Sequence, residues 1–514
     1  MRAAIYNRHL ATMGGGERYT GMLAAVLTHE AVEVDLVGHG DITLDALQQH
    51  LGIDLSGVRL RLVPDVGEEA ISELSAEYDL FVNASYMSRV RSEAKHGSYA
   101  VYFPTPWDHD LTRLQKTLSR RLGPYVCSVG MPFEYGHGWF PPEGGRRRSW
   151  SWTGGDAELR LGPGPAREII IQVGRPAAPA PCTLTVLANG QPVGEVQVRP
   201  GSFTTHHLRL PASVRPLLVA FQSETFAPTP PDQRVLGVAI SRIFMGGSRL
   251  RLRERLGYRQ PYLRRDPGNL DFLDSYQQVV SISEYTREWV QRYWHRDSDL
   301  LFPPVHTSAV PVGDKRDQIL SVGRFFGQGR GHSKKQLEMV QAFVAAQDHG
   351  ELQGWEYHLV GGCSDEDLPY LEQVRAAGTG HAVHLHSNAP RALVSDLFAT
   401  SKLFWHATGL GEHPEEAPWV FEHFGITTVE AMAAGCVPVV IAMAGQKEIV
   451  RDGLDGFLFT TLAQLQERSA CLAADEQLRS RLATSATVRA GTFSEHAFAA
   501  RWSELVHALV DSGR

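Results

Sequence analysis

The sequence contains little cysteine, and its cysteines have no paired spacing. The 514 residues include five of them: Cys127, Cys182, Cys363, Cys436 and Cys471. An odd number without a Cys-x-x-Cys pair argues against a disulfide framework and against a cysteine zinc site. We therefore expect a protein of a reducing compartment and predict a cytoplasmic location.

Long apolar segments and an excess of basic charge are also missing. No uninterrupted apolar stretch of about 18 residues occurs, so a membrane-spanning helix is not expected, and residues 1–16 lack the apolar core of a signal peptide. The formal net charge is −7, which argues against a nucleic-acid partner. The HExxH, CxxC and GxSxG motifs are absent, so zinc-protease, thiol-redox and hydrolase chemistries are disfavoured.

Both ends of the chain contain short apolar runs that alternate with amphipathic stretches. The N-terminal runs are AAIY, VEVDLVG, LRLVP, YDLFVNAS and YAVYFP, and the C-terminal runs include QILSVG, WEYHLVGG, AVHLH, KLFWHAT and VPVVIA. This alternation predicts parallel sheets with crossover helices, and therefore an α/β fold class with two such regions.

The segment from residue 133 to 247 has a different pattern. Short β-type runs are separated by Pro- and Gly-rich turns, and the Asn189-Gly190 pair predicts a tight hairpin. About seven such runs predict an antiparallel β-sandwich, inserted late in the first α/β region. The aromatic residues of this segment could either stack on sugars or pack in the core, and we favour core packing. These residues are Trp139, Phe140, Trp150 and Trp152.

The segment EHFGITTVEAMAAGCVPVV, residues 422–440, places two acidic residues around a Phe-Gly-Ile turn. Residues 427–434 predict a helix, so the free amides and positive dipole end at the turn predict an anion site. Glu422 precedes the helix and Glu430 is expected near its first turn, so the two carboxylates would contact different parts of one ligand. A phosphorylated sugar suits this arrangement. The alternative is a solvated charge at Glu422 and a dipole-favoured acid at Glu430.

The same segment resembles the E-x7-E signature of retaining GT-B glycosyltransferases, particularly family 4, which includes the eukaryotic lipid-linked-oligosaccharide mannosyltransferases. Four further segments resemble that family: FPPV, SVGRFF, HATGLG and EIVRDGLDGFLF. The resemblance covers both α/β regions but not the segment 133–247. It implies two Rossmann-like domains facing a cleft. It also implies metal-independent, configuration-retaining transfer of a hexose-type sugar from a UDP- or GDP-sugar to a hydroxyl acceptor.

Matching positions give each residue an implied role. Glu422 would lie near the reacting sugar, and Arg324 and Lys334 would neutralise the leaving diphosphate, so these three form the predicted catalytic set. Two fixed cations can stabilise that charge without a metal, and no metal or cofactor is expected beside the donor. Lys335 is the alternative to Lys334, one residue out of register. The implied donor-binding residues are Gly15, Gly16, Asn388, Phe424, Gly425, Ile426 and Glu430. His406 follows an apolar strand-like run and precedes a glycine turn, so we also expect it at the donor site; a structural histidine hydrogen-bonded under the loop is the alternative.

The resemblance also sets the predicted domain limits. We expect an N-terminal Rossmann-like domain on the acceptor side in two parts, 1–132 and 248–310, interrupted by the sandwich at 133–247. A C-terminal Rossmann-like, nucleotide-sugar-binding domain follows at 311–490. Residues 491–514 are expected to form a helix that packs back on the N-terminal domain.

The partners and the acceptor side leave alternatives open. The expected acceptor is a glycan or a lipid-linked glycan, as in polysaccharide assembly. Family members often have a histidine near the sugar in the first domain. Tyr102 stands at the corresponding position, and His109 is the histidine that could take over this role. The helix predicted at 111–123 carries leucines on one side and basic residues elsewhere. It suits either an anionic membrane surface or, as we favour, a core-facing position. The alternative function is a non-catalytic carbohydrate-binding protein that uses the sandwich.

Overall fold

A computed structural model describes residues 1–65, 67–127, 133–145, 148–229, 232–245, 260, 263, 270–307, 313–327 and 333–511. The chain divides into two compact units. The first comprises Met1–Thr20, Leu27–Tyr99 and Thr105–Gln277, and the second comprises Gly21–Val26, Ala100–Pro104 and Gln278–Arg514. Among the described residues, no helix is both long and apolar enough to cross a bilayer.

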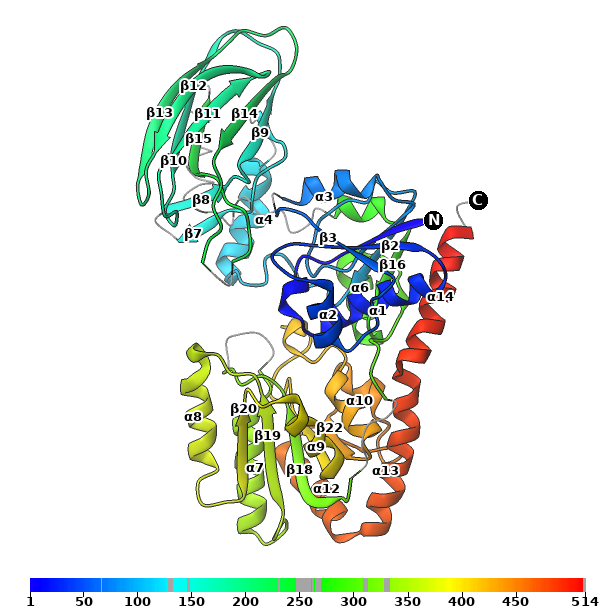
Figure 1. The fold of residues 1–514 in the computed structure, drawn as a ribbon. Coiled ribbons are helices and arrows are strands. Elements are labelled where there is room, and N and C mark those ends of the chain that lie inside the picture. The colour runs from blue at the N-terminus through cyan, green and yellow to red at the C-terminus, as the bar shows by residue number, and fades with distance from the viewer. Residues whose placement is uncertain are drawn as a thin grey trace. The chain divides into compact units, whose positions relative to one another are not determined.

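A seven-stranded sheet with the strand order β17-β16-β5-β4-β1-β2-β3 is built from the first α/β region (Figure 1). Its described strand pairs are parallel, as the alternating runs predict. The strands are β1 (Arg2–Tyr6), β2 (Glu33–Gly38), β3 (Val58–Leu62), β4 (Leu80–Asn83), β5 (His96–Val101), β16 (Gln278–Ser281) and β17 (Asp299–Leu300). The accompanying helices are α1 (Gly15–His29), α2 (Leu44–Leu51), α3 (Glu68–Ser75), α4 (Arg113–Cys127) and α6 (Glu284–Trp294).

Helix α4 corrects one prediction. Two leucines of its apolar side do not face a core, because Leu114 is 70% exposed and Leu122 is 39% exposed. The basic residues Arg113, Arg120 and Arg121 are exposed as well. The core-facing position that we favoured is therefore wrong for these two leucines, since amphipathic periodicity alone does not reveal whether a helix has a packing partner.

Ten short strands lie between β5 and β16 in the chain (Figure 1). They form two five-stranded sheets with the orders β13-β10-β15-β8-β7 and β12-β11-β14-β9-β6. The strands are β6 (Phe133–Tyr135), β7 (Glu143–Gly145), β8 (Arg148–Trp152), β9 (Asp156–Leu161), β10 (Arg167–Gly174), β11 (Cys182–Ala188), β12 (Gln191–Val198), β13 (Phe203–Leu210), β14 (Leu217–Ser223) and β15 (Ala239–Met245).

These two sheets form the predicted antiparallel sandwich. One hydrophobic cluster takes residues from both, for example Ile171 of β10 and Val186 of β11. Asn189 and Gly190 adopt positive φ angles of 48° and 79° in the predicted hairpin. A smaller cluster buries Phe140 and Trp152, with Trp150 packed against it, which confirms the packing that we favoured for these aromatic residues.

The C-terminal region forms a six-stranded parallel sheet with the order β20-β19-β18-β21-β22-β23. Its strands are β18 (Arg316–Val322), β19 (Glu356–Gly361), β20 (Val383–Ser387), β21 (Ser401–His406), β22 (Val437–Ile441) and β23 (Phe457–Phe459). The helices are α7 (Gln336–Asp348), α8 (Leu368–Ala377), α9 (Arg391–Thr400), α10 (Ile426–Ala433), α11 (Gln446–Ile449), α12 (Leu462–Ala474) and α13 (Glu476–Ala490). A buried cluster that includes Trp405 and Phe343 joins sheet and helices.

Helix α14 (Glu495–Asp511) ends the described chain. Trp502 is 1% exposed, and its indole Nε1 donates a hydrogen bond to the carbonyl of Leu23 in α1, 3.2 Å away. The predicted domain limits at residues 132, 247, 248, 310 and 311 lie outside the described residues, so these limits stay predictions.

Candidate functional site

The turn that carries the E-x7-E signature is fixed by glycine. Gly425 has a φ of 124° and directly precedes α10, and an added Cβ there would overlap with the side-chain amide of Gln446. The adjacent residue, Gly445, packs closely against the backbone of Phe424, and its amide donates a hydrogen bond to the carbonyl of Glu422 at 3.0 Å. The turn therefore has little freedom, and the amides that begin α10 have a fixed direction.

Three polar side chains from separate elements converge in front of this turn. Lys334, just before α7, places its ammonium 2.5 Å from Oε2 of Glu422. His406, the last residue of β21, places Nε2 3.2 Å from the same oxygen. The Lys334 and Glu422 side chains are 18% and 23% exposed, whereas His406 is almost fully buried. The carboxylate thus has a fixed cation on one side and an imidazole on the other.

Burial sets the protonation of His406. Desolvation lowers its pKa, although the neighbouring Glu422 acts in the opposite direction. The ring is therefore neutral near pH 7, and its Nε2 also lies 3.2 Å from the hydroxyl of Thr408. Among the described residues, the buried Nδ1 of His406 has no hydrogen-bond partner.

Arg324 follows β18 and is exposed to solvent. The stem of Lys334 covers its neighbour Gly323, where an added Cβ would lie 2.8 Å from the Lys334 Cγ. Within the part of the chain that the structure describes, no partner of the Arg324 guanidinium is found. The structure therefore brings one exposed cation and one half-buried cation to the same strand end.

The neighbouring Lys335 has a different environment. It is 4% exposed, has a φ of 56° and forms an ion pair with Glu412 at 2.8 Å. Lys334, and not Lys335, therefore contacts Glu422 in this structure.

The position of Glu430 corrects the sequence analysis. Helix α10 begins at Ile426, one residue earlier than predicted, so Glu430 is its fifth residue and the first turn contains no acid. The interpretation of Glu430 as a dipole-favoured first-turn acid is therefore wrong. Phe424 and Gly425 are buried, whereas Ile426 and Glu430 are partly exposed.

Asn388 lies one residue beyond β20, with a φ of 52°. Its Oδ1 accepts from the amide of Cys363, and its Nδ2 donates to the Cys363 carbonyl, both at 2.9 Å. Gly362, which precedes Cys363, lies beside Arg324. Asn388 therefore holds the loop after β19 in place, close to Arg324.

The predicted glycine loop belongs to the first unit. Gly15 and Gly16 are the first two residues of α1, and Gly15 is exposed. The carboxylate of Glu17 accepts from the Gly14 amide at 2.6 Å, so one donor at the helix start is satisfied within the chain.

Sequence reasoning missed His423, which separates Glu422 from the Phe-Gly-Ile turn. Its ring stacks on Phe103, with centroids 4.1 Å apart and an interplanar angle of 10°. The Tyr285 ring is also stacked with His423, with ring centroids 6.4 Å apart. No motif spacing indicates this contact, because Phe103 and His423 are far apart in the chain.

The first unit also contains a pocket of about 870 Å³ that the sequence did not reveal. Its lining residues follow β1, β3, β4 and β5 or belong to the sandwich loop 136–142, and they include Arg8, Glu68, Glu69, Tyr86, Arg89, Trp107, His109, Asp110, Trp139 and Phe140. The carboxyl ends of parallel strands are the usual ligand-binding edge of such sheets. This rule for parallel strands could have indicated Tyr86 and Trp107 as candidate ligand-binding residues from the sequence.

Charges and aromatic rings alternate around this pocket. The Arg89 guanidinium lies 4.3 Å from the ring centroid of Trp107. Burial raises the pKa of Glu68, whose carboxylate accepts from the Arg89 amide at 2.7 Å. His109 lines the pocket, whereas Tyr102 lies in the second unit, where its carbonyl accepts from the Thr286 hydroxyl at 3.0 Å.

Comparison with known proteins agrees with this arrangement. Residues 307–489 match the family model described as Glycosyl transferases group 1. A GDP-Man:Man(3)GlcNAc(2)-PP-Dol alpha-1,2-mannosyltransferase of Dictyostelium discoideum is 25% identical over 252 residues, which are 46% of this chain and 48% of that protein. The chain thus matches about half the length of this curated relative.

Solved structures show the same architecture. Anabaena Alr3699/HepE in complex with UDP superposes with a TM-score of 0.52 at 12% identity, covering 99% of this chain and 100% of that one. Sucrose-phosphate synthase of Thermosynechococcus elongatus gives 0.51 at 12% identity, covering 99% of both chains. A glycosyltransferase of Rickettsia africae superposes with a TM-score of 0.51 at 10% identity, covering 99% of this chain and 98% of that one. The predicted GT-B fold class is confirmed, whereas family 4, retention and metal independence stay predictions.

Proposed function

We propose that this chain is a retaining glycosyltransferase that moves a hexose-type sugar from a UDP- or GDP-sugar to a hydroxyl acceptor, in glycan or polysaccharide assembly. The observation that carries the proposal is the convergence of Lys334 and His406 on Glu422 in front of the α10 turn. The family match over residues 307–489 lies on the same elements and supports it.

The two cations suit a diphosphate leaving group. When the bond between the anomeric carbon and the diphosphate breaks, negative charge develops on the phosphate oxygens. Arg324 offers a planar fork and Lys334 a point charge, and both can stabilise that negative charge. We propose that Lys334 turns one of its N–H donors from Glu422 to the phosphate when donor binds.

Glu422 is proposed to face the sugar. Its carboxylate, held by Lys334 and His406, would accept hydrogen bonds from sugar hydroxyls and stabilise the positive charge that develops at the anomeric carbon. The backbone of Phe424, Gly425 and Ile426 would contact sugar and phosphates, and Glu430 would accept from ribose hydroxyls.

Retention follows if the acceptor attacks from the face that the diphosphate leaves. The acceptor oxygen bonds to the anomeric carbon, the carbon–phosphate oxygen bond breaks, and the acceptor proton passes to the departing phosphate. This route needs no second carboxylate as a nucleophile, in contrast to the carboxylate pair of a retaining glycosidase.

We assign the acceptor to the pocket of the first unit. Tyr86, Trp107 and Trp139 offer ring surfaces on which pyranose rings can stack. Asp110 and Glu69, which also line the pocket, supply acceptors for sugar hydroxyls. A glycan is therefore the proposed acceptor, and His109 is the proposed histidine on the acceptor side.

Helix α4 supports peripheral contact with an anionic membrane surface. Its exposed leucines and its exposed arginines are the two features that such a helix uses to bind lipid. A membrane position suits a lipid-linked acceptor, and the Dictyostelium relative carries a PP-Dol acceptor in its name. We propose a cytoplasmic protein that contacts the inner membrane face.

Thermal stabilisation by nucleotides in the presence of EDTA tests the donor assignment. A ligand at about a hundredfold excess over its Kd should raise the free energy of unfolding by about 2.7 kcal/mol. We expect UDP or GDP, but not ADP or CMP, to stabilise the protein, and we expect Glu430→Ala to lose the effect. Glu416→Ala, an exposed acid of the same unit, is the matched control. Absence of stabilisation by all four would overturn the proposal and favour a carbohydrate-binding protein.

A further inference from the structure

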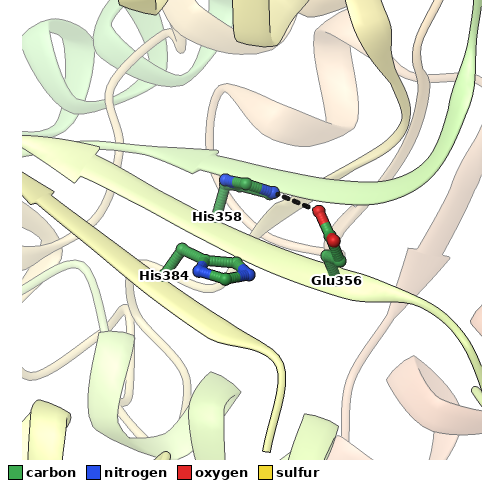
Figure 2. Close-up of side chains that lie close together, drawn as sticks. All are labelled: Glu356, His358 and His384. Atoms are coloured by element: carbon green, nitrogen blue, oxygen red, sulfur yellow. Dashed lines mark hydrogen bonds and ion pairs between the residues drawn. The ribbon is translucent and has the colours of Figure 1, made fainter.

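A cluster of histidine and carboxylate side chains, none of which is among the groups proposed to bind donor, lies on β19 and β20. His358 of β19 is paired in register with His384 of β20. Glu356 precedes His358 by two residues and therefore points to the same face of the sheet. Figure 2 shows the His358 and Glu356 side chains directed toward each other, with the His384 ring beside them.

We propose that Glu356, His358 and His384 bind one first-row divalent ion of borderline softness, such as Zn²⁺. One ligand atom from each side chain lies within 4.8 Å of the other two. Bonds of about 2.0–2.2 Å from nitrogen and oxygen to zinc need these atoms slightly closer together. His384 is exposed, so rotation of its ring can close the site, and the exposed side leaves a coordination position for water.

The hydrogen bonds around His358 prepare it as a ligand. Its Nε2 lies 3.1 Å from the Glu356 Oε2, and its Nδ1 lies 3.1 Å from Nε2 of His386. A metal on Nε2 leaves the ring proton on Nδ1, which then donates to His386. A second hydrogen bond of this kind orients most metal-bound histidines, so His386 is a positioning residue in this site.

The carboxylate is also held in place before an ion binds. The side-chain amide of Gln318 donates to the Glu356 Oε2 at 2.9 Å, so this oxygen is kept beside the His358 ring. Metal binding uses the deprotonated forms of both groups, a neutral imidazole and a carboxylate.

The donor set also indicates the class of ion. Two imidazoles and one carboxylate suit zinc and its first-row neighbours, whereas magnesium and calcium prefer oxygen ligands alone. The ion would connect β20, which has a neighbour on one side only among the described strands, to β19. We therefore assign it a structural role in the second unit, outside sugar transfer.

Titration of the EDTA-stripped, tag-free full chain with Co²⁺ tests the site. We expect the visible absorption of Co²⁺ bound by nitrogen and oxygen ligands, saturating at one equivalent and displaced by Zn²⁺. His384→Ala, His358→Ala and Glu356→Gln should each weaken binding by roughly tenfold or more, and His386→Ala should weaken it while keeping a Co²⁺ spectrum. Zn²⁺ should raise the unfolding temperature of the wild type but not of His384→Ala.

His381→Ala is the matched control, because His381 is a nearby histidine that bonds instead to Asp348 at 3.0 Å, and its Co²⁺ affinity should be unchanged. His384 is exposed, so its variant should keep the wild-type unfolding temperature in EDTA and separate lost binding from misfolding. Absence of a one-equivalent Co²⁺ spectrum, or unchanged affinity in His384→Ala, would overturn the proposal. Neither outcome depends on sugar transfer or nucleotide binding.

Discussion

The Lys334 ammonium lies 2.5 Å from the Glu422 carboxylate, although 88 residues separate them in the chain. Both side chains are mostly buried, so each compensates the charge of the other. Removal of one partner leaves a mostly buried charge without compensation. The pair therefore links the position of the carboxylate to the cation that we assign to the leaving phosphate.

Glu422→Ala and Lys334→Ala should each lower kcat for sugar transfer at least tenfold, which corresponds to about 1.4 kcal/mol or more in the activation barrier. The physical reason is the loss of a charge that acts in the transition state. The measurement is steady-state kinetics. Its donor is the nucleoside diphosphate-sugar that contains whichever nucleotide, UDP or GDP, stabilises the protein.

Lys335→Ala is the control for this pair, because Lys335 bonds to Glu412 and not to Glu422. It should keep kcat within about threefold of the wild type if only Lys334 acts on the phosphate. Equal losses in the two lysine variants, or unchanged turnover in both Glu422→Ala and Lys334→Ala with folding intact, would contradict the assignment.

Trp107→Ala should raise the KM for the acceptor roughly tenfold, because a ring that stacks on sugar contributes on the order of 1 kcal/mol or more. Nucleotide stabilisation should stay unchanged, since Trp107 lines the pocket of the first unit, whereas Lys334, Glu422 and Glu430 belong to the second unit. Val214→Ser, a change at a 94% exposed residue of the first unit, is the control. An unchanged acceptor KM would exclude this pocket as the acceptor site.

Flotation with anionic vesicles tests helix α4. Leu114→Asp and the double change Arg120→Ala/Arg121→Ala should each reduce the bound fraction at least severalfold, because the first removes apolar burial and the second removes attraction to the lipid charge. Leu368→Asp changes a 46% exposed leucine of another helix and should bind as the wild type does. Equal flotation of all variants, or none of the wild type, would argue against membrane contact.

Much of the fold could be predicted because local patterns determine it. β22 occupies residues 437–441, as apolar runs before and after glycine turns predict, and the Asn189-Gly190 hairpin follows from the positive φ angles of both residues. His406 was expected near Glu422's segment only as a residue after a buried strand; the structure places its Nε2 3.2 Å from the Glu422 carboxylate, and its role in donor binding stays a prediction.

Features that depend on packing between distant segments were not predictable. Leu114 on α4 has the periodicity of a core residue, yet no element covers most of its side chain. The pairing of His358 with His384 depends on the register of two strands, which the separation of 26 positions does not reveal. The stacking of His423 on Phe103 likewise needs the tertiary structure.

Gly445→Ala should destabilise the second unit by at least about 1–3 kcal/mol, because a Cβ there would overlap with backbone atoms of Phe424. Nucleotide stabilisation should fall with it, since the Gly445 amide holds the carbonyl of Glu422. Gly491→Ala is the control: a Cβ there meets no atom within 4 Å among the described residues. Urea unfolding of the three proteins makes the comparison, and equal stabilities would show that the turn can relax.

Glu448 should make stability depend on pH. Its carboxylate accepts from the amides of Tyr285 and Glu284 at 2.6 and 2.7 Å at the start of α6. Burial outweighs these bonds and raises its pKa from the ordinary value of 4.5 to about 7. Between these two pH values the folded protein keeps a proton that the unfolded chain releases. The Glu448 contribution to the free energy of unfolding is therefore full below about pH 4.5. It falls as pH rises toward 7, by at most about 1.4 kcal/mol per pH unit.

Glu448→Gln removes this titration and keeps the size of the side chain. Urea unfolding of both proteins at pH 5, 6, 7 and 8 should therefore show the wild type losing stability relative to the variant up to about pH 7, with a constant difference above it. Exposed acids such as Glu416 do not share this environment, so Glu416→Gln should keep the wild-type profile. Parallel profiles for the wild type and Glu448→Gln would mean that Glu448 titrates alike in the folded and unfolded chains, and that the two amide bonds fully offset its burial.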